Sequence, residues 1–423
     1  MEKSINKMGT MPVNKLMLTL GAPMIISMVL QAVYNIVDSA FVSNMQGTGE
    51  MALNALTLAF PIQMLMVAVS IGTGVGTNAL LSRCLGMGDS KKAARVGGNA
   101  MFLAIIIYVL CLIFGIFGVG VYIGTQTTNS QIYDMATDYL RICSVISIGI
   151  VFFSIFEKML QATGLSLYST VAQITGAVIN IILDPIMIYG LFGLPQMGVK
   201  GAALATIISQ GVSCLWVLKF LTGKKTVLKI RLKNLVLDGK IVTSVLSLGV
   251  SPFIMQATEC LIQLTFNNGM LKYGNDLYVA LMSILFSLTQ LIWMPLNGFS
   301  QGAQPVIGYN YGAKRFDRVK KAFKLQFTVS ICFSLFAVAL VEVFPTAFLK
   351  MFTNDQELID IGINSTRLFL AGMSVMGAQC ACQQTFLALG EAKISMFLAC
   401  LRKIILLFPL ALILPNIANM GVW

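Results

Sequence analysis

Long apolar stretches recur along the whole chain and are separated by short polar breaks. A helix of about 20 apolar residues crosses a hydrocarbon core of roughly 30 Å, and lipid offers its backbone polar groups no other partner. The alternating segments of about ten residues that a porin-type barrel needs are absent from the sequence. The pattern therefore predicts an all-α, polytopic membrane protein with about eleven spans. The predicted spans are 16–43, 52–82, 97–124, 133–160, 166–193, 199–222, 241–271, 277–308, 319–349, 359–389 and 393–415.

Basic residues fall on alternate loops of this topology. They follow the second, sixth and eighth spans: Arg83, Lys91, Lys92 and Arg95, then Lys224, Lys225, Lys229, Arg231 and Lys233, then Lys314, Arg315, Arg318, Lys320 and Lys321. The intervening loops 44–51 and 124–130 carry no Lys or Arg. The positive-inside rule then predicts that the N-terminus and the basic loops are cytoplasmic, in a multi-pass protein of the plasma (cytoplasmic) membrane. The formal net charge of +12 follows from this topology and indicates anionic lipid, not nucleic acid, as the partner.

Composition narrows the possible chemistry. The chain has 57% hydrophobic and 11% charged residues and a mean hydropathy of +0.82. This composition is not typical of a water-soluble domain. It has no histidine, which removes Ser-His and Cys-His catalysis, and no P-loop for ATP. The nine cysteines lie scattered in apolar segments and read as buried, reduced thiols. We therefore expect neither an enzyme, nor a cofactor, nor ATP binding by this chain, and we interpret the first span as uncleaved.

The chain contains an internal repeat. Gly88 and Gly312 lie in similar segments 224 residues apart, and Arg141 and Arg367 lie 226 residues apart. The repeat unit holds six spans, so both copies have the same orientation and are related by a pseudo-two-fold axis along the membrane normal. We expect an N-terminal lobe at 1–222, a basic cytoplasmic linker at 223–240 and a C-terminal lobe at 241–423.

The last match of the repeat concerns the end of the sequence. Met197-Gly-Val introduces the sixth predicted span, and Met420-Gly-Val recurs 223 residues later, close to Trp423. The pattern predicts a twelve-span protein whose C-terminal lobe lacks its last helix in this chain, and it predicts weak transport by the chain as given.

Among the ionisable residues inside predicted spans, four stand out: Asp38, Asp184, Glu259 and Arg402. A charge at mid-span costs about 2.5–3.5 kcal/mol on insertion scales, so each is a candidate functional residue. Tyr34 lies four residues before Asp38 and therefore on the same helical face.

The second carboxylate has a similar neighbour. Asn180 lies four residues before Asp184, Pro185 leaves the carbonyl of Ile181 without its helical donor, and Thr206 could add a hydroxyl. Together with Asp38, these oxygens suit Na⁺, and the two carboxylates could equally share a proton.

Structural readings remain open for each of these residues. The carboxylates could simply join neighbouring helices by hydrogen bonds, with Gln256 and Gln263 as the partners of Glu259. Arg402 could extend to a membrane interface, as long basic side chains do.

Three segments show a family resemblance. They are Gly-Ala-Pro…Asn-Ile-Val-Asp at 21–38, Asn-Ile-Ile-Leu-Asp-Pro at 180–185 with Gly-Ala-Ala-Leu-Ala-Thr at 201–206, and Gly-Ala-Gln-Pro-Val-Ile-Gly-Tyr-Asn-Tyr-Gly-Ala at 302–313. Over essentially its full length the chain resembles the multidrug and toxic compound extrusion family of secondary transporters. The resemblance implies two six-helix lobes around a central cavity, with export of lipophilic organic cations in exchange for Na⁺ or H⁺ by alternating access.

The resemblance also implies roles for single residues. The family's cation site corresponds to Tyr34, Asp38, Asn180, Asp184 and Thr206, which makes Na⁺ a possible ligand of the last four. Substrate contacts are expected from Asp38, Glu259 and Gln256, and Pro23 stands where the family can bend its first helix. The acidic residue that some members carry in their tenth helix is missing between 367 and 390, which favours coupling in the N-terminal lobe.

Two other functions compete with this interpretation. A flippase for lipid-linked oligosaccharide precursors would need basic residues in its cavity, and only Arg402 supports it. A channel would need a filter loop, which the sequence does not show. We expect a monomeric antiporter.

Overall fold

The computed structural model describes residues 7–45, 49–223, 228, 236–273, 276–353 and 355–414. Within these ranges every regular element is a helix, which confirms the all-α prediction. The first half contains α1 (Lys7–Thr10), α2 (Val13–Ser43), α3 (Gly49–Gly86), α4 (Ser90–Ile113), η1 (Phe114–Gly118), α5 (Val119–Gln126), α6 (Ser130–Val145), α7 (Ile148–Ala162), α8 (Ser166–Tyr189), η2 (Leu191–Gly193) and α9 (Val199–Thr222). The second half contains α10 (Gly239–Tyr273), α11 (Asp276–Gly312), α12 (Phe316–Val343), α13 (Pro345–Leu349), α14 (Gln356–Ala371), η4 (Gly372–Val375), α15 (Met376–Leu389), α16 (Ala392–Cys400), η5 (Leu401–Leu407) and α17 (Phe408–Ile413).

Ten spans at most are supported in the described part of the chain. Nine helical segments are long and apolar enough to cross a membrane, and the bent pair α6–α7, with 48° between its helices, makes ten. The predicted count of about eleven is therefore not confirmed. The segment expected at 359–389 is helical but is interrupted by the 3₁₀ turn η4, and its two parts have only 16 and 14 residues. Most of the predicted linker 223–240 and all of Met420–Trp423 lie outside the described residues.

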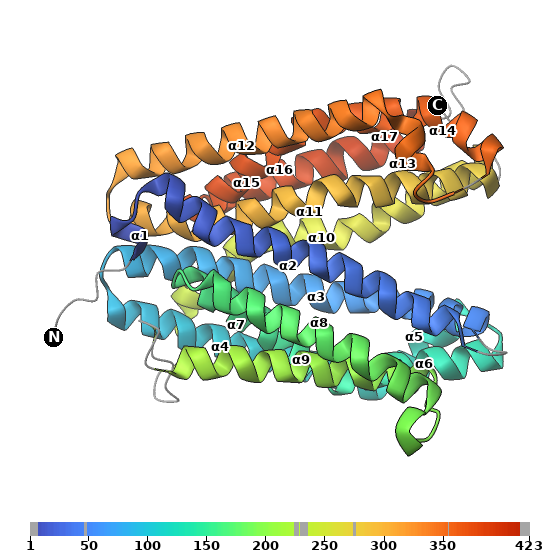
Figure 1. Ribbon diagram of the computed structural model, residues 1–423. Helices are drawn as coiled ribbons and strands as arrows, with labels where there is room; N and C mark the ends of the chain where they lie inside the picture. The colour runs from blue at the N-terminus through green and yellow to red at the C-terminus, as the bar shows by residue number, and fades with distance from the viewer. Residues whose placement is uncertain are drawn as a thin grey trace.

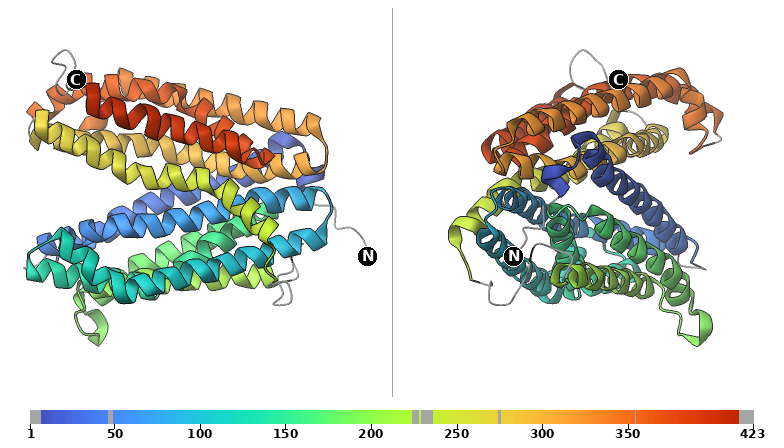
Figure 2. Two further views of the ribbon diagram at one scale, coloured as in Figure 1. Left: turned by 180° about the vertical axis from the view of Figure 1, so that it is seen from behind. Right: turned by 60° about the vertical axis from the view of Figure 1, so that its left-hand side comes forward.

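The helices form two bundles that meet at one end of the molecule and diverge toward the other (Figures 1 and 2). The first bundle holds α3 to α9, and the second holds α10 to α17. At the joined end, Gly390 and Gly312 of the second bundle lie against Arg83 of α3, and Arg315 lies against Gly9 of α1. This end carries the basic loops that follow α3 and α11, and we call it the basic end.

Helix α2 crosses from one bundle to the other (Figure 1). Its first turns pack in an apolar cluster with α11 and α12, formed by Leu16 and Leu20 against Val306, Ile307 and Val319. Its last turns lie against α8, where the Tyr189 hydroxyl donates to the carbonyl oxygen of Phe41 at 2.7 Å. The long first helix therefore belongs to both bundles.

Glycines allow the two bundles to approach closely. A Cβ on Gly76 of α3 would lie 2.1 Å from the carbonyl oxygen of Val245 in α10, and one on Gly249 would lie 2.4 Å from the carbonyl oxygen of Gly72. Only a residue without a side chain fits there, as is common where helices pack in membranes. We call these contacts between α3 and α10 the glycine seam.

Candidate functional site

Helices α2 and α8 run side by side in the same direction with a constant register. Ser27 bonds to Gln173, and Gln173 also donates to Gln31 at 3.2 Å. Further toward the C-terminal ends of both helices, the Tyr189 hydroxyl donates to the carbonyl oxygen of Phe41. These pairs are 142 to 148 residues apart, so the register brings Asp38 and Asp184 to the same level.

The two carboxyl groups lie within hydrogen-bonding reach of each other. Asp184 is completely buried and accepts a hydrogen bond from the Asn180 amide at 3.2 Å, and Asn180 is also buried. Tyr34 is close enough to both carboxyl groups to interact with them electrostatically. The structure thus gathers Tyr34, Asp38, Asn180 and Asp184, which we call the N-lobe acidic site.

Three buried oxygens of this site have no hydrogen-bond partner: Asp38 Oδ1, Asn180 Oδ1 and Asp184 Oδ2. A buried polar atom without a partner is uncommon and calls for an explanation. Carboxylate and amide oxygens are the ligands that hard cations prefer, and two adjoining carboxyl groups can share one proton. The residues present therefore fit either Na⁺ or a proton.

Thr206 reaches the level of the site but has a partner in its own helix. Helix α9 packs antiparallel to α8, with Gly198 N bonded to the Ile188 carbonyl oxygen at 3.1 Å and the Ser213 hydroxyl bonded to the Ala172 carbonyl oxygen at 3.0 Å. This register sets Thr206 opposite the stretch from Asn180 to Asp184. Its hydroxyl donates to the carbonyl oxygen of Ala202 at 3.0 Å, so only its oxygen lone pairs remain for a cation.

Two residues that were not predicted from the sequence also adjoin the acidic site. Tyr139 of α6 interacts with both Asp38 and Tyr34 and is 5% exposed. The amide of Gln63 in α3 donates to its hydroxyl at 3.3 Å. A tyrosine hydroxyl inside the predicted span 133–160 was the available sequence signal.

The candidate residues of the second bundle do not join this site. Glu259 of α10 forms an ion pair with Lys403, whose side chain is 7% exposed against 30% for Glu259. The Gln256 amide contacts the sulfur of Met64 at 3.4 Å, in α3 of the other bundle. The partner of Glu259 is therefore a lysine, where the sequence suggested Gln256 and Gln263.

Arg402 lies in the middle of its span. It is residue 11 of the 22-residue segment Ala392–Ile413, within the π-helical turn η5, and its guanidinium donates to Gln379 Oε1 at 3.1 Å. This central position differs from the interfacial one that the sequence suggested.

Pro23 lies inside α2, which continues through it as one helix from Val13 to Ser43. It stands between two close contacts with α11. A Cβ on Gly21 would lie 2.7 Å from the Phe299 ring, and one on Gly298 would lie 2.8 Å from the Cα of Ile25. A bend at Pro23 would therefore disturb the packing of α2 on α11.

Comparison with known proteins agrees with this architecture. The family model described as MatE matches residues 23–186 and 252–413, which together make up most of the chain. The multidrug export protein MepA of Staphylococcus aureus is 25% identical over 382 residues, covering 86% of this chain and 80% of the relative. MepA of Staphylococcus haemolyticus is 24% identical over 368 residues, covering 86% and 79%.

Solved structures share the fold. One, described as the outward-facing conformation of a multidrug resistance MATE family transporter of the MOP superfamily, has a TM-score of 0.90 at 24% identity and covers 99% of this chain and 92% of its own. A MOP superfamily transporter from Pyrococcus furiosus, described as having reversed polarity in its binding pocket, has a TM-score of 0.89 at 24% identity, covering 98% and 91%. Another, described as MATE in the bent conformation, has a TM-score of 0.88 at 24% identity, covering 97% and 90%. With the family model matching both halves, this chain belongs to the MatE family, whose members are membrane transporters and not enzymes.

Proposed function

We propose that this protein is a secondary antiporter that exports lipophilic organic cations in exchange for Na⁺ or H⁺ by alternating access. The observation that carries the proposal is the N-lobe acidic site, with two adjoining carboxyl groups and three buried oxygens that lack partners. A group that binds a coupling cation needs such unsatisfied oxygens inside the membrane. The similarity to proteins named as multidrug exporters supports drug-like organic substrates.

Competition for the acidic site provides the coupling. A Na⁺ ion or proton bound at Asp38 and Asp184 neutralises negative charge, which weakens the hold of the same region on a cationic substrate. One elementary charge moved through 100 mV is worth about 2.3 kcal/mol, enough to sustain a gradient of roughly fifty-fold. Tyr34, Tyr139 and Asn180 would orient the carboxyl groups and add oxygen ligands.

We place coupling in the first bundle because Glu259, the candidate carboxylate of the second, is already paired. Lys403 neutralises Glu259, so Glu259 and Gln256 remain candidates for substrate contact alone. Arg402 in the middle of its span favours the alternative of a flippase for lipid-linked oligosaccharide precursors. Binding of a radiolabelled organic cation and of a lipid-linked sugar, each at varied Na⁺ and pH, separates the two functions.

We further propose that the basic end is cytoplasmic, as the positive-inside rule predicts, and that the monomer is the transporting unit. Bending of α2 at Pro23 would release part of its packing on α11 and so link the acidic site to lobe movement. The neighbours described as MATE in the bent and in the straight conformation support this role.

The central test replaces each carboxylate of the acidic site with its neutral isostere. Asp38→Asn and Asp184→Asn should each lower ion-driven efflux of an organic cation at least about tenfold, because the coupling ion loses a charged ligand. The measurement is dye efflux from proteoliposomes under an imposed Na⁺ or pH gradient, which also identifies the coupling ion.

Asp138→Asn is the matched control. Asp138 is a partly exposed carboxylate in the same lobe, 3.0 Å from Lys200, and this variant should retain efflux. Normal ion-driven efflux by both acidic-site variants would refute the proposed function.

A further inference from the structure

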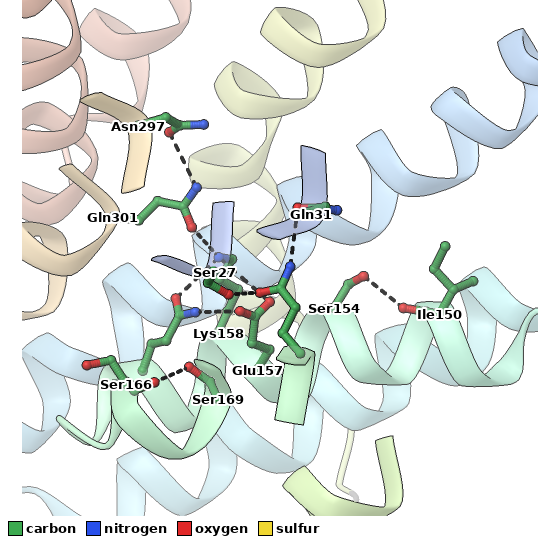
Figure 3. A network of polar contacts seen from close by, with 12 residues as sticks. Ser27, Gln31, Ile150, Ser154, Glu157, Lys158, Ser166, Ser169, Asn297 and Gln301 are labelled. Atoms are coloured by element: carbon green, nitrogen blue, oxygen red, sulfur yellow. Dashed lines mark hydrogen bonds and ion pairs between the residues drawn. The ribbon is translucent and has the colours of Figure 1, made fainter. Parts of the chain in front are cut away.

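A second buried polar cluster, which contains none of the residues of the acidic site, connects the two bundles (Figure 3). The Lys158 ammonium of α7 donates to Gln301 Oε1 of α11 and, at 3.2 Å, to Gln161 Oε1. The Gln161 amide donates to Glu157 at 2.8 Å, and Gln301 donates to Asn297 at 3.3 Å. The exposed fractions are 7% for Glu157, 3% for Lys158, 1% for Gln161 and 9% for Gln301. A lysine of the first bundle thus makes a buried contact with the second.

The lysine reaches the other bundle by passing α3, which contacts both α7 and α11. A Cβ on Gly74 of α3 would lie 2.9 Å from Cγ of Lys158. The aliphatic part of Lys158 therefore occupies the space that a side chain at position 74 would need. Because Gly74 has no side chain, the side chain of Lys158 can pass α3 and reach Gln301.

The partners of the ammonium explain why this contact depends on the arrangement of the lobes. Its carboxylate partner, Glu157, is 3.9 Å away, so amide oxygens provide its close hydrogen bonds. One of these, Gln301, belongs to the second bundle. An ammonium buried without its full set of partners is costly. Separation of the lobes at this level would remove Gln301 and require water to replace it.

We propose that Lys158 and Gln301 form an interlobe latch, a pair of positioning residues that stabilises the joined lobes and must break in each transport cycle. This inference rests on the proposed alternating access, but it assigns neither residue to ion or substrate binding. A neutral acceptor suits the task, because an amide holds the ammonium less strongly than a carboxylate would. A latch must open again, and a buried ion pair at this position would resist opening.

The two sides of the latch predict opposite effects. Gln301→Leu and Lys158→Met should raise the ratio of separated to joined lobes about tenfold or more, since each removes a hydrogen bond to a charged group. Gln301→Glu should instead lower that ratio and slow transport, because it provides Lys158 with a buried anionic partner. A residue that merely supported folding would not give opposite shifts for leucine and glutamate at one position.

The measurement is the distance between spin labels on opposite lobes at the basic end. Lys91→Cys at the start of α4 and Lys320→Cys in α12 are exposed positions for the labels, introduced after replacement of the nine native cysteines. Pulsed electron paramagnetic resonance on the whole chain in nanodiscs gives the populations with joined and with separated lobes. The double variant Lys158→Met with Gln301→Leu should shift the ratio no further than either single variant, because both break the same bond.

Ser154→Ala is the matched control. Ser154 lies one turn before Lys158 in α7 and is buried, but its hydroxyl donates at 2.8 Å to Ile150 of its own helix. This variant should leave the distance distribution unchanged. If Lys158→Met fails to fold, the leucine and glutamate variants at 301 decide the matter alone.

Unchanged distance distributions in both Gln301 variants would refute the latch. That result would leave the proposed function intact as long as Asp38→Asn abolishes ion-driven efflux. Conversely, a shifted distribution together with normal efflux by Asp38→Asn and Asp184→Asn would support the latch and refute coupling at the acidic site.

Discussion

A carboxyl group inside the membrane has different partners in the two halves of this protein. Asp38 and Asp184 adjoin one another, and each keeps an oxygen without a partner. Glu259 is instead neutralised by Lys403 from a neighbouring helix. A mid-span carboxylate thus belongs to a candidate ion site in one lobe and to an ion pair in the other. The difference lies in the neighbouring side chain, a second carboxyl group in one case and a lysine in the other.

The Glu259–Lys403 pair leads to a stability prediction. Glu259→Gln should destabilise the protein, because Lys403 would remain a buried cation without its carboxylate. Breaking a fully buried pair costs about 3–5 kcal/mol, and the cost here should be smaller because the Glu259 side chain is 30% exposed. Thermal unfolding in detergent measures it.

The double variant is the control for that prediction. Glu259→Gln combined with Lys403→Met removes both charges and should recover most of the lost stability. A single variant as stable as the parent protein would show that the pair contributes nothing.

At the scale of elements, close contacts between helices depend on glycines at particular positions along each helix. Gly76 and Gly249 let the backbones of α3 and α10 meet, and Gly21 and Gly298 do the same for α2 and α11. The atoms opposing Gly76 belong to the backbone of Val245 and cannot rotate away as a side chain would. These contacts join the lobes through close backbone packing.

Gly76→Ala should therefore push α3 and α10 apart. Overpacking of this kind typically costs about 1–3 kcal/mol, seen as a lower unfolding temperature in detergent. Gly211→Ala in α9 is the control, because a Cβ there meets no atom within 4 Å and alanine favours a helix over glycine. Equal unfolding temperatures for the two variants would contradict the glycine seam.

At the scale of the whole molecule, the lobes are joined at the basic end and diverge at the other (Figure 2). The latch, the glycine seam and the apolar cluster around α1 and the start of α2 all contribute to this joining. If the basic end is cytoplasmic, the protein is closed toward the cytoplasm in this conformation. The orientation therefore decides which side of the membrane the diverging lobes face.

Labelling with a membrane-impermeant maleimide tests the orientation. In a background without native cysteines, Lys91→Cys should react only in inside-out vesicles, because it lies at the basic end. Gln196→Cys, exposed in the loop between α8 and α9, should react only in right-side-out vesicles. The opposite labelling pattern would reverse the proposed topology.

Hydrophobic length and spacing in the sequence predicted the helical membrane fold and the residues of the acidic site. A bilayer forces each long apolar run into a helix, and residues four apart share a helical face. The pairings of Tyr34 with Asp38 and of Asn180 with Asp184 therefore follow from local geometry. A carboxylate at mid-span is energetically costly to insert in a membrane and therefore stands out as a functional candidate. Asp38, Asp184 and Glu259 could be selected on this basis without a structure.

Contacts between distant helices were decided only by the tertiary structure. Sequence spacing carries no information about which face of α2 meets α8, or that Tyr139 and Gln63 adjoin Asp38. It could not pair Glu259 with Lys403, 144 residues away, or carry Lys158 past Gly74 to Gln301. Such pairings depend on how whole helices pack, and helix packing is fixed by the shapes of many side chains together and not by any local pattern.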